Sequence, residues 1–476
     1  MRQAHMIFDI GTGNSRVGIV STAGEVLSVA TKDSVYYYDR DFKDSIYFVP
    51  SEWIKIFQEL VHSAMEKAGE VEILSVSASS QRQGIVLISE EGESLVGYQN
   101  GDNRGADYMR DIPWSRVKEL TGLDPMPIYS CIKFRGTMKK QPYVADKTKY
   151  YTSISDWIGY LATGKVVWEK SQAMQTAVYD VAAGTWSEEL CGLLEIDPGK
   201  LPPLAPAGTV LGKLTPEFAQ KFHLPKSAVY VVGAADTQTA LIGSAAEENE
   251  VTIVSGTTTP VVKIKDRFMQ VPVWMGPHAV DGQYMLEVNA ASTGINLQRF
   301  KNMFLQQYTY EDLIGRCLEK PIPGCMAMFA MGPHLAEAPV QYGGFLLDNP
   351  IGHDMEAVDF FHAMSLDIAM SITLCIERIN QIDPYGENYV VGCGGGLRSQ
   401  IITQAIADLS GFEIRLFQGY DQATMMGCMR LCNKGLQISA GERKLVSSVQ
   451  PDENPRLQEY FEKWKRMRSC YRLMNS

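Results

Sequence analysis

Two short segments rich in glycine and hydroxyl side chains carry the residue types that bind phosphate. The segment 9–16 reads Asp-Ile-Gly-Thr-Gly-Asn-Ser-Arg, and the segment 255–259 reads Ser-Gly-Thr-Thr-Thr. Apolar runs flank both, so each is predicted to form the tip of a strand–turn–strand hairpin. Glycine lets the backbone approach an anion closely, and hydroxyl and backbone N–H groups bond phosphate oxygens. Each could instead be an ordinary turn, but one in each half of the chain favours two grips on a polyphosphate.

Two aspartates are predicted to lie at strand ends and could supply carboxylate chemistry. Asp9 lies near the end of the predicted strand Ile7–Ile10, and Asp236 closes the predicted strand Ala228–Val232, which ends at Gly233-Ala-Ala-Asp236. Such carboxylates can take a proton from a substrate hydroxyl or help to hold Mg²⁺. Beside phosphate-binding hairpins they suit Mg²⁺-assisted phosphoryl transfer. Either aspartate could instead cap a turn or a helix.

Two further segments could contact small molecules. The run Gly394-Gly-Gly396 could let the backbone pass close to a flat ligand such as adenine, although glycine runs are often simple strand-to-helix turns. The segment Gln81-Arg82-Gln83 follows a predicted strand and offers amides and a guanidinium to hydroxyl or carbonyl groups. A surface ion pair is an equal alternative for Arg82.

Strand-like and helix-like segments alternate along the chain, which predicts an α/β fold. The predicted strands are Ile7–Ile10, Val17–Val20, Ile73–Ala78, Ile85–Ile88, Ala228–Val232 and Asn388–Val391. The predicted helices are Ser51–Ala68 behind a serine cap and a proline, Ala357–Gln381, Ser399–Leu409, and a basic, amphipathic and solvated helix at Arg456–Arg472. The polar stretches between about 90 and 230 are interpreted as insertions that carry substrate contacts, and the acidic segment Glu247–Glu250 as a hinge.

The composition is typical of a globular protein, with 45% apolar and 21% charged residues. A chain of 476 residues predicts two or three domains. The net charge is −11 and the pI about 5.3, which disfavours nucleic acid and anionic membranes as partners because both need a basic surface. A few local cations and backbone amides still suffice to bind ATP.

The cysteines and histidines form no metal-ligand spacing. There are nine cysteines without a C-x-x-C pair, and seven histidines, so we expect reduced thiols. A strand is predicted almost at the first residue, and no apolar run approaches the roughly 18 residues of a membrane span. We therefore expect neither a signal peptide nor a membrane span, and a cytoplasmic location.

Taken together, and in this order along nearly the whole chain, the segments resemble the FGGY carbohydrate kinases of the actin, hexokinase and heat-shock-70 ATPase superfamily. The resemblance implies two actin-like (ribonuclease H-like) α/β domains that flank a central ATP cleft. Residues 1–245 would form the N-terminal domain, with the substrate side, the first hairpin and the catalytic aspartate. Residues 246–476 would form the C-terminal domain, with the second hairpin and the adenine side.

The resemblance also implies ATP and Mg²⁺ as cofactors, and roles for individual residues. Asp236 would be the catalytic base, and Asp9 and Asp236 would hold the metal. The residues implied to bind the nucleotide are Thr12, Gly13, Asn14, Ser15, Arg16, Gly256, Thr257, Gly294, Gln298, Gly394, Gly395, Gly396 and Ser399. The residues implied to bind the substrate are Gln81, Arg82, Gln83, Asp102, Tyr129, Asp236 and Thr237.

Several positions depart from the common xylulokinase pattern of this family. Asn100 stands where tryptophan is usual, Thr237 stands where glutamine often follows the aspartate, and no tryptophan follows Lys133. The segment Pro333–Pro339 replaces a Gly-Glu-Arg segment. These changes leave phosphoryl transfer in place and leave the identity of the sugar open.

The autoinducer-2 kinase branch of the family is the most similar in its local segments. The shared features are Asn100-x-Asp102-x-Arg104, Ile154-Ser-Asp-Trp-Ile158 and the strand Gly84–Leu87. We therefore predict an ATP-dependent kinase that phosphorylates a hydroxyl of a small sugar, ketose or polyol, with a linear autoinducer-2-like molecule as one option. The alternatives are a xylulokinase-type pentulose kinase, an inactive sugar-binding regulator on the same scaffold, and a chaperone-type ATPase. A homodimer is a further open option.

Overall fold

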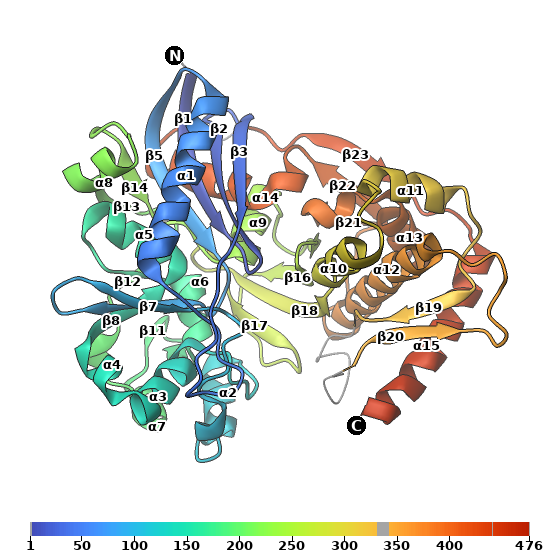
Figure 1. The fold of residues 1–476 in the computed structure, drawn as a ribbon, viewed down its shortest axis with the longest axis horizontal. Helices are drawn as coiled ribbons and strands as arrows, with labels where there is room; N and C mark the ends of the chain where they lie inside the picture. The colour runs from blue at the N-terminus through green and yellow to red at the C-terminus, as the bar shows by residue number, and fades with distance from the viewer. Residues whose placement is uncertain (1, 331–341, 440, 476) are drawn as a thin grey trace. The chain divides into compact units, whose positions relative to one another are not determined.

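The computed structural model describes residues 2–330, 342–439 and 441–475, with side chains described up to residue 470 (Figure 1). The segment Pro333–Pro339, singled out in the sequence, lies outside the described residues. The chain divides into two compact units. The first consists of Met1–Gly243, Asp266–Met285 and Ala423–Glu442, and the second consists of Ser244–Lys265, Leu286–Gln422 and Arg443–Ser476. The predicted domain boundary at residue 245 stays a prediction, since these units are defined by packing and not by function.

The first unit is built on a six-stranded sheet with the strand order β13-β14-β5-β1-β2-β3. Its strands are β1 (Arg2–Ile10), β2 (Asn14–Ser21), β3 (Val26–Asp33), β5 (Val71–Ser80), β13 (Val210–Lys213) and β14 (Val229–Val231). Strands β1, β5 and β14 are parallel to one another, whereas β2 and β13 pair antiparallel with their neighbours. The carboxyl ends of β1, β5 and β14 therefore meet at one edge of the sheet.

Helices cover both faces of this sheet, so successive side chains of β1 enter different cores. Phe8 packs edge-on against Phe57 of α1 (Pro50–Ala68), with ring centroids 5.6 Å apart, in the same core as α5 (Ile154–Thr163). Ile7 faces the opposite core, which Met425 of α14 (Ala423–Gly435) helps to fill. Figure 1 shows α1 and α5 along one face of the sheet. Helices α9 (Asp236–Gly243) and α14 lie next to each other, apart from α1 and α5. A central strand buried on both faces is typical of parallel α/β sheets.

The helix predicted at Ser51–Ala68 is present, but its predicted serine cap is wrong. Val49 occupies the N-cap position without a side-chain hydrogen bond, and Pro50 begins the helix. Proline suits this first position because its backbone has no N–H group to leave unpaired.

Much of the rest of the first unit lies within the predicted insertions between 90 and 230, while the strands at 47–48, 85–89 and 274–277 lie outside that range. A second sheet has the order β4-β7-β6-β8, and two-stranded sheets pair β10 with β11 and β12 with β9. These strands, with β17, are β4 (Tyr47–Phe48), β6 (Ile85–Ser89), β7 (Ser94–Tyr98), β8 (Thr148–Ser153), β9 (Trp168–Glu169), β10 (Tyr179–Asp180), β11 (Thr185–Trp186), β12 (Leu204–Ala205) and β17 (Trp274–Pro277). The remaining helices are α2 (Trp114–Thr121), α3 (Ser130–Lys140), α4 (Pro142–Lys147), α6 (Lys170–Ala173), α7 (Glu188–Leu194) and α8 (Pro216–Lys221).

The second unit repeats the strand pattern of the first. Its strands follow the order β18-β16-β15-β21-β22-β23. As β1 does in the first unit, β15 pairs antiparallel with the strand that follows it and parallel with a later strand, and the antiparallel edge strand β23 corresponds to β13. The strands are β15 (Val251–Val254), β16 (Thr258–Lys265), β18 (Tyr284–Ser292), β21 (Tyr389–Cys393), β22 (Glu413–Phe417) and β23 (Leu445–Val449), with a separate pair of β19 (Cys325–Met328) and β20 (Gly344–Leu347).

The helices of the second unit are α10 (Gly294–Phe304), α11 (Tyr310–Leu318), α12 (Ala357–Ile382), α13 (Gln400–Ser410) and α15 (Pro455–Asn475). The prediction that no apolar run reaches spanning length is wrong for α12, which is long and apolar enough by length and composition. However, 89% of its most apolar stretch is buried inside the structure, as in the core helix of a globular unit.

The charges of the terminal helix α15 had predicted a solvated helix, but part of the helix is buried. Trp464 is fully buried and donates its indole N–H to Asp367 of α12 at 3.0 Å. Arg468 is also buried and lies 4.8 Å from the Trp464 ring centroid. The helix therefore closes one side of the second core, while its other described charged residues, from Arg456 to Arg466, are exposed or partly exposed.

The acidic segment Glu247–Glu250, predicted as a hinge, belongs to the second unit. Glu250 is buried and accepts two hydrogen bonds from the Arg443 guanidinium, at 2.9 and 2.8 Å, and a third from the Tyr389 hydroxyl at 2.7 Å. Burial raises the pKa of this carboxyl, but the bonds from Arg443 and its other donors outweigh it, so the net pKa of Glu250 is lowered. These hydrogen bonds attach the segment to the rest of the second unit.

Candidate active site

The first predicted hairpin is present and is tightly closed. Asp9 pairs with Arg16 and Ile10 with Ser15 across β1 and β2. The Gly11 N–H donates to the Asn14 carbonyl at 3.0 Å, which leaves the four-residue tip from Gly11 to Asn14. Within this tip Thr12 and Asn14 are partly exposed and Gly13 is exposed. The Arg16 guanidinium forms an ion pair with the Asp9 carboxylate at the base of the tip.

Gln81 and Asn100 hold this tip from the side. The Gln81 N–H donates to the Ile10 carbonyl at 2.8 Å, and its side-chain carbonyl accepts the Asn100 N–H at 3.1 Å. The Asn100 amide then donates to the Thr12 hydroxyl at 3.0 Å. The sequence marked Asn100 as a departure from the xylulokinase pattern and as part of the Asn100-x-Asp102-x-Arg104 segment. Its contact with Thr12 follows from the folding of distant loops.

The two aspartates predicted to do chemistry lie at the same edge of the first sheet. The parallel register aligns Asp9 with Ser79 of β5, and Ser80 forms a parallel bridge with Ala235, the residue before Asp236. Strand neighbours are about 4.8 Å apart, so backbone positions two strands away are separated by about 10 Å. The two carboxylates thus flank the end of β5.

Asp236 does not end a strand, as the sequence had suggested. Strand β14 stops at Val231, and Asp236 is the first residue of α9. Its carboxylate accepts the N–H of the next residue, Thr237, at 2.7 Å. Asp236 is nevertheless partly exposed, whereas Thr237 is buried.

The turn Gln81-Arg82-Gln83 follows β5, and a buried lysine, Lys133, bonds to its backbone. Gln83 has a left-handed backbone, with a φ of 63°. The Lys133 ammonium donates to the Gln83 carbonyl at 2.8 Å and to the Asn100 carbonyl at 2.9 Å. Burial lowers the pKa of Lys133 to about 7, with the nearby Asp102 charge opposing that shift. The lysine therefore joins the substrate-side turn to the loop that holds the first hairpin.

The side chains of the turn point to different partners. The Gln83 amide donates to the Gln175 side chain at 2.5 Å. The Arg82 guanidinium lies 5.5 Å from the Trp274 ring centroid, and Arg82 is 9% exposed. Gln175 and Trp274 carried no signal in the sequence, because their nearness to the turn depends on the packing of η2 (Met174–Thr176) and β17.

Asp102 and Tyr129, both predicted to bind substrate, lie in the core beside the turn. Asp102 has no exposed surface and accepts two hydrogen bonds from the Arg104 guanidinium, at 2.9 and 3.0 Å, and one from the Ile46 N–H at 2.6 Å. Arg104 also stacks 3.5 Å from the Tyr98 ring centroid. Tyr129 is fully buried and donates its hydroxyl to the Asp124 carbonyl at 2.8 Å, and burial raises its pKa.

The second predicted hairpin is also present, between β15 and β16, and it meets the glycine run. The Gly256 N–H donates to the Thr258 carbonyl at 3.0 Å, and Gly256 and Thr257 are exposed. The Gly396 N–H donates to the Ser255 carbonyl at 3.2 Å. Gly394 has a φ of 97°, and a Cβ atom there would overlap the Ser255 carbonyl. Glycine is therefore required at this contact.

The start of α10 meets the same hairpin. A Cβ atom on Gly294 would overlap the Gly256 carbonyl, and the Ile295 N–H donates to the Thr257 carbonyl at 3.3 Å. The structure thus brings together the predicted nucleotide contacts of the second unit, from three separate segments. Gln298 is exposed one turn further along α10, and Gly395 is exposed in η5 (Gly395–Arg398). Ser399 follows η5, and its N–H donates to the Gly396 carbonyl at 3.2 Å.

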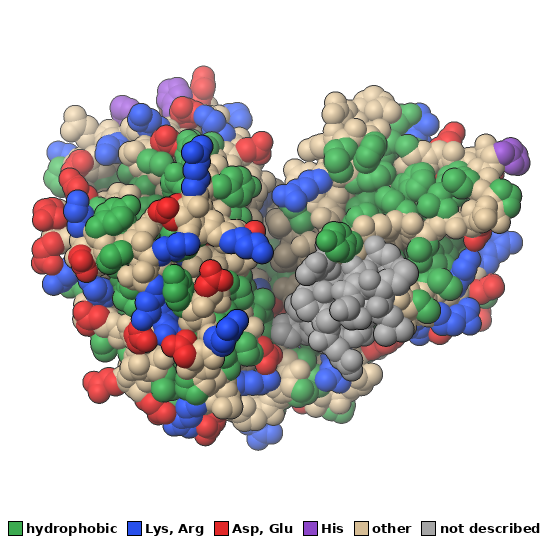
Figure 2. Space-filling view, turned by 60° about the horizontal axis from the view of Figure 1, so that its bottom comes forward, with side chains coloured by type: hydrophobic (Ala, Val, Ile, Leu, Met, Phe, Trp, Pro, Cys, Tyr) green, Lys and Arg blue, Asp and Glu red, His purple; other side chains and the backbone are tan. Residues whose placement is uncertain are grey.

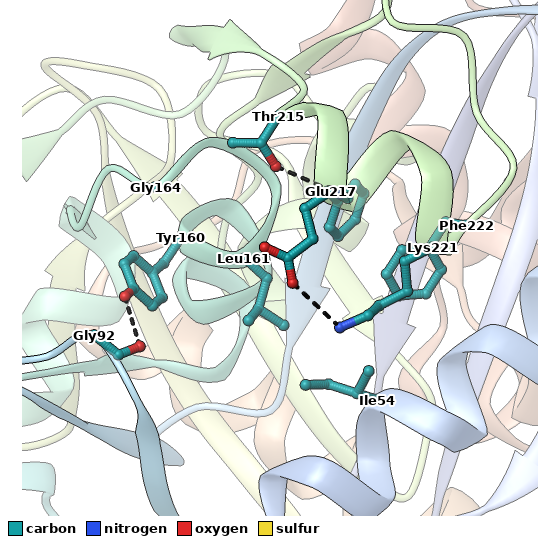
Figure 3. Close-up of a pocket in the computed structure, with 10 residues that line it drawn as sticks. Ile54, Gly92, Tyr160, Leu161, Gly164, Thr215, Glu217, Lys221 and Phe222 are labelled. Carbon is teal, nitrogen blue, oxygen red and sulfur yellow. Dashed lines mark hydrogen bonds and ion pairs between the residues drawn. The ribbon is translucent and has the colours of Figure 1, made fainter.

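A separate cavity of about 270 Å³ lies among α1, α5 and α8, away from the predicted residues (Figure 3). Tyr160 donates its hydroxyl to the Gly92 carbonyl at 2.7 Å on one side, and Glu217 forms an ion pair with Lys221 at 3.8 Å on the other. Both charged side chains are largely exposed. The cavity contains none of the predicted catalytic, nucleotide or substrate residues.

Comparison with known proteins identifies the family of this chain. Residues 4–243 match the N-terminal domain of the "FGGY family of carbohydrate kinases". The chain is also 35% identical to the "Putative sugar kinase YoaC" of Bacillus subtilis, over 98% of this chain and 96% of that one. The chain belongs to the FGGY family of carbohydrate kinases. The resemblance inferred from the hairpins and the glycine run is thereby confirmed.

Two further similarities describe this FGGY kinase. It is 22% identical to an "Autoinducer-2 kinase" of Klebsiella pneumoniae, over 97% of this chain and 92% of that one. Its fold matches the crystal structure of a gluconate kinase from Lactobacillus acidophilus with a TM-score of 0.82, at 18% identity, over 100% of this chain and 99% of that one. The predicted α/β fold of two actin-like units is confirmed by this agreement and by the repeated strand pattern.

FGGY kinases transfer phosphate from ATP, so this chain is a sugar kinase whose donor is ATP. The donor set around Asp9 and Asp236 also fits Mg²⁺. This ion keeps several water ligands and binds one or two carboxylates together with substrate phosphates. Two carboxylates flanking the end of β5, beside a hairpin whose residues are predicted to bind phosphate, are a set of that kind.

Proposed function

We propose that this FGGY kinase transfers the γ-phosphate of ATP to a hydroxyl of a small, linear sugar, ketose or polyol, with Asp236 as the general base. The observation that carries the proposal is the shared sheet edge. Asp9 with its hairpin, the turn that follows β5, and Asp236 all follow parallel neighbouring strands. A base, a phosphate-binding tip and a polar turn within about 10 Å of one another suit in-line phosphoryl transfer.

The proposed roles follow from chemistry and exposure. Asp236 is partly exposed at the start of α9, so its carboxylate can accept a proton from a substrate hydroxyl. Thr12, Gly13 and Asn14 at the first tip would bind phosphate oxygens, as would Gly256 and Thr257 at the second. Asp9 and Asp236 would hold Mg²⁺ through water, and the ion would supply charge neutralisation at the phosphates.

The polar turn would contact the acceptor sugar. Arg82 and Gln83 offer donors and acceptors for hydroxyl groups, and Arg82 lies beside the flat face of Trp274. Asp102 would act by fixing Arg104 and the Asn100 loop, because its carboxylate is fully occupied. Named relatives include an autoinducer-2 kinase and a gluconate kinase. Together with the local segments shared with the autoinducer-2 branch, this supports a small, linear acceptor.

The proposal is tested by replacing the base. We expect Asp236→Asn to lower kcat by about 10²- to 10⁴-fold, because the amide cannot accept the proton. The affinity for ATP, measured by calorimetry, should change by less than threefold. Asp197→Asn is the matched control, since Asp197 caps an exposed turn and accepts only the Gly199 N–H at 2.9 Å. A D236N enzyme with the wild-type kcat would contradict the assignment.

The acceptor is tested by measuring ADP release with ketopentoses, polyols, gluconate and the linear autoinducer-2 precursor. Release stimulated by one acceptor would support the kinase and identify its substrate class. Release without any acceptor would point to an ATPase, and no release with any of them to an inactive sugar-binding protein.

A further inference from the structure

The short helix α6 (Lys170–Ala173) is bonded to the backbone segment that leads into Asp236. The Ser171 hydroxyl accepts the N–H of Ala235, the residue directly before Asp236, at 3.1 Å. Ser171 is completely buried. This bond satisfies a backbone donor in a dry environment, where an unpaired N–H group is destabilising.

A buried carboxylate sets the direction of that hydroxyl. Glu169 is 1% exposed, and one of its oxygens, Oε2, accepts the Ser171 hydroxyl at 2.5 Å, the Ser171 N–H at 2.9 Å and the Gln172 N–H at 3.1 Å. A serine hydroxyl has a single hydrogen. Because that hydrogen points to Glu169, the lone pairs of Ser171 face the Ala235 N–H.

The same helix also binds the strand opposite Ala235. The Gln172 amide donates to the Ser80 carbonyl at 3.1 Å and to the Ser80 hydroxyl at 3.0 Å. Ser80 is the partner of Ala235 in the parallel bridge. Ser171 and Gln172, consecutive residues of α6, therefore bond to the two partners of this bridge, Ala235 and Ser80. Asp236 directly follows Ala235.

The helix is itself anchored to the core. The Asp156 carboxylate accepts the Glu169 N–H at 2.9 Å and the Ser153 hydroxyl at 2.6 Å. Asp156 is 2% exposed and lies in the first turn of α5. A continuous set of hydrogen bonds thus runs from α5 through Glu169 and Ser171 to the residue before Asp236.

We propose that Glu169 and Ser171 are positioning residues that fix Asp236 for proton transfer. This inference rests on the proposed role of Asp236 as the base. Neither residue touches the substrate. They act by holding the backbone at Ala235, so that the Asp236 carboxylate stays within hydrogen-bond reach of the acceptor hydroxyl. A misplacement of about 1 Å at such a group lowers a rate by about 10²-fold.

The first test removes the bonds one at a time. We expect Ser171→Ala and Glu169→Ala each to lower kcat by about 10- to 100-fold, with the KM values for ATP and for the sugar changed by less than about threefold. Glu169→Gln should keep kcat within about threefold of the wild type, because the amide carbonyl oxygen at the place of Oε2 still accepts the Ser171 hydroxyl. Rescue by glutamine separates an acceptor role from a requirement for charge.

The second test separates positioning from general stability. Ser187→Ala is the matched control, since Ser187 caps α7 by accepting the Leu190 N–H at 3.3 Å and makes no bond to residues 232–236. It should lower Tm about as much as Ser171→Ala while leaving kcat unchanged. In the D236N background, Ser171→Ala should lower the residual kcat by less than twofold, because both changes disable the same step.

The outcomes distinguish the two claims. If D236N lowers kcat but S171A keeps the wild-type value, the positioning inference is wrong and the proposed function stands. If S171A and S187A lower kcat equally and in proportion to the folded fraction, the bonds are only structural. If D236N itself keeps the wild-type kcat, the proposed function fails, and the inference fails with it.

Discussion

The polar residues around the candidate site divide into exposed groups and buried ones that support them. Thr12, Gly13 and Asn14 offer atoms to a ligand, whereas Asp102 and Lys133 are fully buried and bonded within the protein. A buried charge is stable only when its hydrogen bonds are satisfied. At Lys133 two carbonyl acceptors need only two N–H donors, which a neutral amine also has.

This arrangement predicts how stability depends on pH. Burial lowers the pKa of Lys133 to about 7, against about 10.4 in the unfolded chain. Between these values the unfolded state holds one proton more than the native state, so this lysine makes stability rise with pH by up to about 1.4 kcal/mol per unit. Below pH 7 the two states hold the same number and the contribution is flat. Asp102, which opposes the shift, and Arg104, which adds to it, are the charged groups facing Lys133.

The measurement compares urea unfolding of the wild type and of Lys133→Met from pH 6 to pH 10. The difference in unfolding free energy, wild type minus variant, should grow above pH 7. Lys139→Met, at an exposed lysine of the same helix, should run parallel to the wild type. A constant difference for Lys133→Met would show that the buried amine keeps its ordinary pKa.

At the scale of elements, the place of Asp236 depends on the crossing of α9 and α14. A Cβ atom on Gly427 of α14 would overlap the Thr239 carbonyl of α9, and one on Gly243 of α9 would overlap the Ala423 carbonyl. The two helix backbones are therefore in direct contact. Since Asp236 begins α9, any separation of the helices moves the proposed base.

We predict that Gly427→Ala destabilises the protein by about 1–3 kcal/mol, because backbone atoms must move to admit the methyl group. It should also lower kcat by shifting Asp236. Gly192→Ala in α7 is the control: its Cβ would meet nothing within 4 Å, so it should stabilise by about 0.5–1 kcal/mol. Urea denaturation measures both variants, and equal effects at the two glycines would contradict the crossing.

Local sequence patterns predicted the elements whose formation depends on residues that lie close together in the sequence. Both hairpins follow from glycine and hydroxyl residues between apolar runs, and α12 from its apolar periodicity. Asp236 was wrongly placed at a strand end because β14 has only three residues and the chain turns before the helix. The assignment of α14 to the first unit could not be predicted, since Met425 reaches the core of Ile7 only through folding.

Supporting residues were missed for the same reason. Gln175, Trp274 and the bonds from Glu169 to Ser171 carry no recognisable motif, and each meets the site through a long-range contact. The burial of Asp102 was also not predictable, because a charged residue in a polar loop usually faces water. Acidic and basic side chains are interspersed over much of the face shown in Figure 2.

At the scale of the whole molecule, one strand pattern occurs twice and carries one phosphate-binding tip in each unit. Strand β1 and strand β15 each pair antiparallel with the next strand and parallel with a later one. The later strands, β5 and β21, end in the polar turn and in the glycine run. We propose that each of the two tips binds phosphate oxygens of ATP.

The proposed nucleotide contacts predict a change in stability that one substitution removes. A nonhydrolysable ATP analogue with Mg²⁺ should stabilise the wild type by about 2.7 kcal/mol at 100 times Kd, measured by urea unfolding. Gly394→Val should lose this gain, since a side chain there overlaps the Ser255 carbonyl and displaces the second tip. Gly282→Val, at a glycine that also has a positive φ but where a Cβ would meet nothing within 4 Å, controls for a glycine change away from the tips. A gain in Gly394→Val equal to that of the wild type would mean that the second tip is not needed to bind ATP.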